Sequence, residues 1–162
     1  MIGEPRVCCE VPILTIRTAE PDDLAQIVFH YAADALGGHG DDWNPRTEAA
    51  YRAAFAAIAT SPDGRLYVAV EEVSVVGVFQ LIVFTTMTGR GARRAKLASV
   101  QVRAENRSSG IGERMVRHAE ALAREAGASA LELGSSKRHH DAHRFYDRLG
   151  DERHREGFRK RL

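Results

Sequence analysis

This sequence of 162 residues has few cysteines, few lysines and no long apolar run. Its two cysteines, Cys8 and Cys9, are adjacent, a spacing that fits neither a redox C-x-x-C pair nor a zinc site. We interpret them as free thiols in a reducing compartment. No apolar run approaches the ~20 residues of a membrane-spanning helix, and residues 1–10 lack the apolar core of a signal peptide. We therefore expect a cytoplasmic protein with no membrane as partner.

An excess of charge of one sign is also absent. The formal net charge is +1, from 23 Lys and Arg against 22 Asp and Glu, and lysine supplies three of the cations. Such a balance gives no long-range attraction to nucleic acid. Glutamates interrupt the basic end at 152–162, which we interpret as a last strand of the sheet. We expect no nucleic-acid partner.

The composition, 44% hydrophobic and 28% charged, is typical of a globular domain. A chain of this length buries about two-thirds of its unfolded surface as one domain, so it needs no disulfide or metal staple. Residues 1–11 show no periodicity and are predicted to be a loose leader before a single domain at 12–162.

Alternation and helical spacing divide that domain into strands and helices. A short strand at 14–17 precedes a helix that Thr18 is placed to cap and Gly37 to end. The further predicted elements are a helix at 47–60, a hairpin at 65–72 and 74–86, a basic loop at 88–96, a strand at 97–102, a helix at 108–127, a strand at 128–136 and a helix at 141–150. This order predicts an α+β fold with a mixed sheet.

The helix predicted at 108–127 has an unusual start. Ser109, Gly110 and Gly112 bring no bulk to its first turn, so bare N–H groups lie at the positive end of the helix dipole. Such a turn binds phosphate, and Arg107 just outside it can add a charge-assisted contact to a diphosphate. The alternative is that these glycines serve only close packing. A G-x-x-x-x-G-K-[ST] run and a complete dinucleotide fingerprint are both missing.

The stretch VQVRAENRSSGIGERM resembles the acetyl-CoA signature of the GNAT N-acyltransferase superfamily, in which a strand leads to [RQ]-x-x-G-x-[GA] at a helix start. Its fixed positions are filled by Arg107, Gly110 and Gly112. HDAHRFYDRLG is similar to the family's second motif, A-x-x-F-Y-x-x-x-G. Its fixed positions are filled by Ala142, Phe145, Tyr146 and Gly150. The resemblance covers residues 12–162 and implies a mostly antiparallel mixed sheet with helices on both faces.

The resemblance also implies an acyltransferase that moves acetyl from acetyl-CoA to the primary amine of a small molecule by direct attack. The diphosphate would lie on the loop before the helix, and the pantetheine would lie along the strand edge like an added strand. The implied cofactor contacts are Val100, Val102, Arg107, Ser108, Ser109, Gly110, Ile111, Gly112, His139 and Tyr146. Tyr146 would also be the catalytic acid that protonates the leaving thiolate.

The sequence departs from the family pattern where the proton-accepting base is concerned. Ala98 and Ser99 stand where some members carry a glutamate, and His139 replaces an asparagine common near the cofactor. The missing carboxylate leaves a second hypothesis, a non-catalytic CoA-binding domain that acts as a sensor or assembly subunit. The sequence is compatible with a monomer and with a homodimer.

The histidines of RHHDAH could in principle bind a metal ion. His139 and His143 are four residues apart, as in H-E-x-x-H, but a third histidine, His140, stands in place of the glutamate base, and no third ligand is near. We predict that the protein uses no metal.

The link before the second predicted helix is the candidate acceptor site. Asp41 and Asp42 offer negative charge and Trp43 an apolar face, a combination suited to an alkylammonium. The alternative is that Asp42 only caps the helix. Opposite, Arg90, Arg93 and Arg94 would favour an acceptor that also carries an acidic group. Water ordered by Asp41, Asp42 or His39 would remove the proton.

Overall fold

The computed structural model describes residues 13–34, 40–154, 156–158 and 160. The predicted leader at 1–11 with Cys8 and Cys9, the helix-ending Gly37 and the water-ordering His39 lie outside the described residues. The predictions made for them therefore remain predictions.

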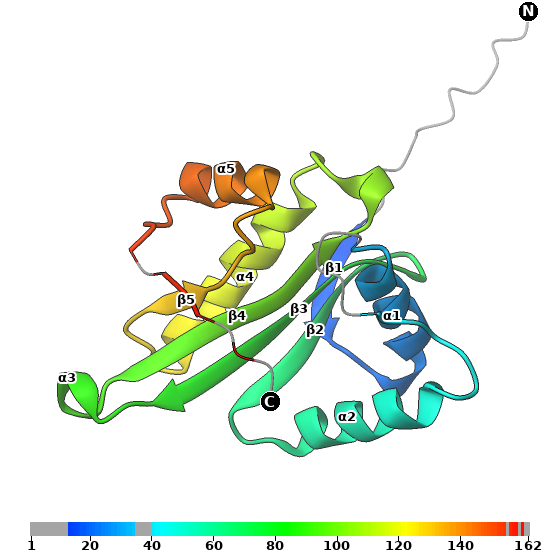
Figure 1. The fold of residues 1–162 in the computed structure, drawn as a ribbon, viewed down its shortest axis with the longest axis horizontal. Coiled ribbons are helices and arrows are strands. Elements are labelled where there is room, and N and C mark those ends of the chain that lie inside the picture. The colour runs from blue at the N-terminus through cyan, green and yellow to red at the C-terminus, as the bar shows by residue number, and fades with distance from the viewer. Residues whose placement is uncertain (1–12, 35–39, 155, 159, 161–162) are drawn as a thin grey trace, which may run out of the picture.

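Five strands form one sheet in chain order (Figure 1). They are β1 (Leu14–Thr18), β2 (Gly64–Glu71), β3 (Ser74–Thr85), β4 (Arg93–Val102) and β5 (Leu131–Leu133). β2, β3 and β4 pair antiparallel across short connections, and β1 pairs antiparallel with β2 after the long segment 19–63. β5 pairs parallel with β4 after a helical crossover. The predicted hairpin and the mixed, mostly antiparallel sheet are confirmed.

Helices pack on both faces of the sheet, as predicted (Figure 1). They are α1 (Leu24–Ala32), α2 (Glu48–Thr60), α4 (Ile111–Glu125) and α5 (His140–Leu149), with short helical turns η1 (Pro21–Asp23), α3 (Thr88–Gly91) and η2 (Ala104–Asn106). On one face, α1 buries Ile27 against β-branched residues such as Val68 and Val78. On the other, α4 buries Met115 against residues such as Phe79, and α5 packs beside it. Strand alternation separates the two cores.

The edge of β4 opens in the second half of the strand. The register with β3 shifts between Val78 and Gln80, and Ser99 has a left-handed backbone with φ 53°; both are signs of a β-bulge, which bends a strand. β5 pairs with β4 only from Ala95 to Leu97. Within the described part of the chain, the outer edge of β4 from residue 98 onward has no strand beside it.

Three details of the sequence prediction are wrong. Thr18 is the last residue of β1 and does not cap the helix. Glu20 is the N-cap, and its backbone N–H donates to the Asp23 carboxylate at 2.7 Å. The described residues of 151–160 contain no strand, so the basic end does not extend the sheet there. The predicted basic loop is shorter, because β4 already begins at Arg93.

Candidate functional site

The loop between β4 and α4 keeps the bare backbone predicted for it. Ser108 and Gly110 both have left-handed backbones, with φ of 64° and 86°, and the first turn of α4 has no side-chain cap. Among the described residues, none supplies an acceptor for the backbone N–H groups of 108–110. Alternating backbone hands and an uncapped helix start aim N–H groups outward, an arrangement that binds anions.

The two glycines of this loop have different roles. A Cβ at Gly110 would meet nothing within 4 Å, so glycine is favoured there by its positive φ and by the open space in front of it. A Cβ at Gly112 would lie 3.3 Å from the Phe145 ring and 3.7 Å from Val102. Gly112 thus brings β4, α4 and α5 into close contact, so the packing alternative holds for Gly112 and the anion-binding one fits Gly110.

The open edge of β4 presents the backbone of Val100 and Val102. The N–H of Arg103 donates to Val76 of β3 at 2.9 Å. Since successive residues of a strand point their backbone groups to opposite sides, Val102 and Val100 face away from β3. The Val102 carbonyl accepts the Arg107 Nε–H at 3.2 Å on that side. An extended chain with amide groups fits such an edge.

Tyr146 of α5 packs against the same core as Val100 and Val102. Its half-buried ring meets Phe145 edge-on, with the ring centroids 5.0 Å apart. Burial, followed by the charge of Asp151, raises the pKa of Tyr146 to about 12. The phenol therefore stays protonated at neutral pH, as a proton donor must.

Polar side chains of β4 lie on the face of the sheet that α1 covers, whereas α5 packs on the other face. Ser99 lies against Tyr31, whose pKa is raised mainly by burial and then by the charge of Asp41. Gln101 donates to Asp34, just after α1, at 3.0 Å. On this side β4 therefore presents a hydroxyl at Ser99 and an amide at Gln101.

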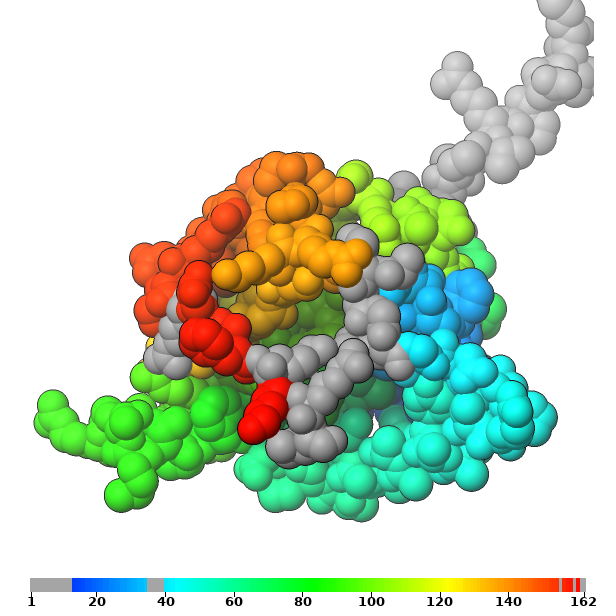
Figure 2. All heavy atoms as spheres, in the orientation of Figure 1, coloured from blue at the N-terminus to red at the C-terminus, as the bar shows by residue number. Residues whose placement is uncertain are grey.

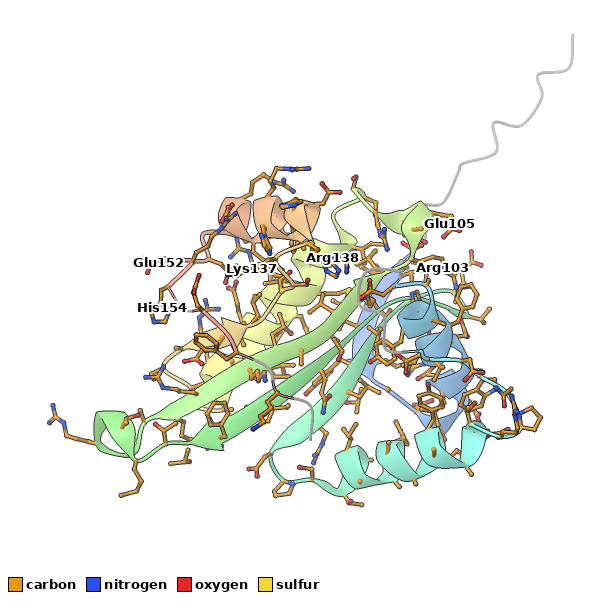
Figure 3. The ribbon with its side chains drawn as sticks, viewed as in Figure 1. Arg103, Glu105, Lys137, Arg138, Glu152 and His154 are labelled. Carbon is orange, nitrogen blue, oxygen red and sulfur yellow. The ribbon has the colours of Figure 1, made fainter. Side chains whose placement is uncertain are left out.

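A groove runs between these two sides (Figure 2). It is bordered by the segment that leads into α5 and by α1, and strand residues form its floor. Lys137 and Arg138 lie on the α5 side and Arg103 at the end of β4 on the α1 side (Figure 3). The Nε of Arg103 is buried and has no hydrogen-bond partner within the described residues. Cationic side chains thus lie on both sides of the groove.

The residues predicted to bind the acceptor differ in their surroundings. Asp41 is half-buried and accepts the Tyr51 hydroxyl at 2.8 Å. Asp42 is exposed, and its carbonyl accepts the Thr47 hydroxyl at 2.7 Å just before α2. Trp43 packs against Tyr51, with the ring centroids 6.1 Å apart. Asp41 alone of the three is shown to influence Tyr31 of α1. Thr47 is the residue at the start of α2, which has no side-chain cap, and the Asp42 carboxylate accepts from the Asn44 amide, so the alternative that Asp42 caps the helix is wrong.

The arginines predicted for the opposite wall lie elsewhere. The tip that carries Arg90 is at the far end of the β3–β4 hairpin from α1 (Figure 1). Arg94 pairs with Glu132 of β5 at 2.6 Å. Sequence reasoning missed Arg103 and Arg138, because nothing in their local spacing distinguishes them from other surface arginines.

A second hollow, of about 600 Å³, is wide open and lies between β1 and α4. Its lining includes Ile16, Arg114 and His118, together with Gly110 from the loop before α4. Neither the open β4 edge nor Tyr146 borders it, so we assign the candidate site to the groove.

The described residues contain no cluster of three or more His, Cys, Asp or Glu side chains placed to hold a metal ion. His140 and His143 meet edge-on with ring centroids 6.2 Å apart. In the part of the chain that the structure describes, no helix has the length and apolarity needed to cross a membrane.

Comparisons with known proteins agree with this geometry. A model of the acetyltransferase (GNAT) family matches residues 26–151. A transcriptional regulator from Bacillus halodurans is 31% identical with a TM-score of 0.88, covering 93% of this chain and 100% of its own. A search of curated proteins found no match.

Two other solved structures share the fold at lower identity. A putative acetyltransferase from Agrobacterium tumefaciens is 24% identical, with a TM-score of 0.79 and coverage of 91% of this chain and 99% of its own. Glucosamine-6-phosphate N-acetyltransferase from Arabidopsis thaliana is 16% identical, with a TM-score of 0.73 and coverage of 93% and 99%.

Proposed function

The chain belongs to the GNAT family of acetyltransferases, and from this premise we propose that it transfers the acetyl group of acetyl-CoA to the primary amine of a small molecule. The observation that carries the proposal is an open β4 edge at Val100 and Val102 followed in the chain by a loop with bare N–H groups at Gly110. The edge fits the amides of pantetheine, and the loop fits its diphosphate. We place the reaction in the cytoplasm.

In this proposal the cofactor contacts are the ten residues inferred from the sequence, and Tyr146 is the catalytic acid. The amine nitrogen forms a bond to the acetyl carbon, and the carbon–sulfur bond breaks. The departing thiolate takes the Tyr146 proton, and Tyr146 regains a proton from the new amide nitrogen. Its raised pKa keeps the phenol protonated until the thiolate departs.

The acceptor that best fits the groove carries an amine and an acidic group. Asp41 supplies negative charge near Tyr31, and Arg103 supplies a buried guanidinium nitrogen that has no partner in the described chain. An anionic substituent on the acceptor would pair with such a guanidinium. Asp42 and Trp43 belong to this proposal only as neighbours of Asp41.

The test is thiol release from acetyl-CoA over a panel of primary amines, including glucosamine 6-phosphate, the substrate named for one protein of the same fold. We expect turnover with at least one amine, and higher kcat/KM for amines that carry a carboxylate or phosphate. If the protein binds CoA by calorimetry but releases no thiol with any amine, the non-catalytic alternative is correct. The name of the Bacillus halodurans relative makes a regulatory CoA-binding domain the specific alternative.

A further inference from the structure

An imidazole and a carboxylate come together between the end of α1 and the start of α5. Asp34 follows α1 and His139 precedes α5, and Asp34 Oδ1 lies 3.7 Å from His139 Nε2. These helices pack on opposite faces of the sheet. Their ends approach each other at the open edge of β4, beyond the point where its pairing with β5 stops at Leu97.

Asp34 is held in one orientation. Its Oδ2 accepts the Gln101 amide at 3.0 Å, while its Oδ1 is turned toward His139. The two side chains are largely shielded, with 17% of Asp34 and 23% of His139 exposed. A shielded carboxylate beside an open amide-binding edge attracts a cation more strongly than one in bulk water.

His139 Nε2 is buried and has no hydrogen-bond partner among the described residues. Buried polar atoms are almost always paired, so this nitrogen calls for an explanation. The 3.7 Å to Asp34 is too long for a hydrogen bond. A ligand nitrogen beside both atoms can lie within about 3 Å of each of them.

We propose that Asp34 and His139 form the subsite for the acceptor's ammonium group and that His139 Nε2 accepts its proton. This rests on the proposed acetyl transfer and supplies the base that Ala98 and Ser99 cannot provide. The Asp34 carboxylate binds R–NH₃⁺, and one proton moves to Nε2. The freed lone pair then forms the bond to the acetyl carbon, and the imidazolium returns its proton to water.

The chemistry of imidazole suits this step, because a ring nitrogen that carries no hydrogen has a lone pair that can accept a proton. The active tautomer must carry its proton on Nδ1, which leaves Nε2 free to accept. Asp34 and His139 both touch the amine, so both are catalytic residues in this proposal.

The test uses acetyl-CoA and the best amine of the panel. Asp34→Asn keeps an oxygen for the Gln101 amide and should raise the amine KM more than tenfold, with the acetyl-CoA KM within about twofold. His139→Gln, which retains an amide near Nε2, should lower kcat at least tenfold. In His139→Ala, added imidazole should restore part of kcat, which only a proton-transfer role predicts.

His140→Gln is the matched control, because His140 is the next residue and is exposed; it should leave kcat and both KM values within twofold. Thermal unfolding of each variant identifies any loss of fold, and imidazole rescue in a folded His139→Ala still supports the proposal. An active wild type with His139→Gln within twofold would refute this inference alone. A wild type that releases no thiol with any amine would refute the proposed function and this inference with it.

Discussion

Gly110 carries the anion-binding role at the scale of single residues. A substitution by aspartate there would place a carboxylate where the diphosphate is expected. We predict that Gly110→Asp abolishes acetyl-CoA binding in calorimetry, through charge repulsion and loss of access to the backbone N–H groups.

The control for Gly110→Asp is Gly127→Asp. Gly127, just beyond the other end of α4, also has a left-handed backbone, with φ of 76°, and open space around it. The Gly127→Asp substitution imposes the same kind of backbone strain far from the loop before α4, and it should leave acetyl-CoA binding intact. If Gly110→Asp binds acetyl-CoA like wild type, the cofactor site lies elsewhere.

Tyr146 carries the predicted proton donation. Tyr146→Phe keeps the ring that packs beside Phe145 and removes the hydroxyl. We predict at least a tenfold fall in kcat with nearly unchanged acetyl-CoA affinity, because the lost contact acts only as the thiolate departs. Tyr67→Phe, which removes a phenol from β2 outside the groove, is the matched control. A kcat within twofold of wild type would assign thiolate protonation to water.

At the scale of elements, α1 is joined to β3 by a titratable contact. His30 is 4% exposed, and its Nε2 lies 2.8 Å from the Val75 carbonyl. A carbonyl only accepts, so Nε2 carries the proton in the neutral ring. Burial lowers the pKa of His30, and the charges of Arg103 and Arg107 act in the same direction. The hydrogen bond to Val75 and the charge of Glu105 oppose this shift.

This lowered pKa predicts a pH-dependent stability. Unfolded histidine titrates near pH 6.5, so on acidification below that value the unfolded chain takes up a proton that the folded one resists. The free energy of unfolding should therefore fall from pH 7.5 to 5.5, by up to about 1.4 kcal/mol per pH unit for this one group.

Urea denaturation at several pH values measures this slope. His30→Gln keeps a donor for Val75 without a titrating ring and should flatten the slope over this range. His154→Gln, at an exposed position, should leave it unchanged. A slope that persists in His30→Gln would mean that other groups determine acid stability.

At the scale of the whole molecule, the groove lies between the end of α1, the open half of β4 and the start of α5. The acceptor prediction belongs here, since the charge of Asp41, which precedes α2, acts on Tyr31 of α1. We predict that Asp41→Asn raises the acceptor KM more than tenfold and leaves the acetyl-CoA KM within about twofold.

Asp42→Asn is the matched control, because Asp42 is the next residue, is exposed and contacts Asn44 and Thr47. It should change neither KM. Steady-state kinetics on the best amine decides between them. Equal effects of the two substitutions would point to general charge attraction, and no effect of either would remove this link from the acceptor site.

The sequence by itself determined what depends on near neighbours. Residues four apart lie on one face of α4, and Arg124 lies 3.0 Å from Glu120. The β2–β3 hairpin and the uncapped loop around Gly110 follow from residues within one turn or one pair of strands. The family resemblance rests on the same kind of local motif, and the family match confirms it.

Only the tertiary structure decided what depends on where a strand ends. Asp34 and His139 are 105 residues apart in numbering, and they meet because β5 stops at Leu133 while β4 continues past its bulge. The same long-range packing makes Gly112 a contact for Phe145 and pairs Arg94 with Glu132. The periodicity of a single helix or strand does not predict such contacts, because each contact depends on how separate elements are placed relative to one another.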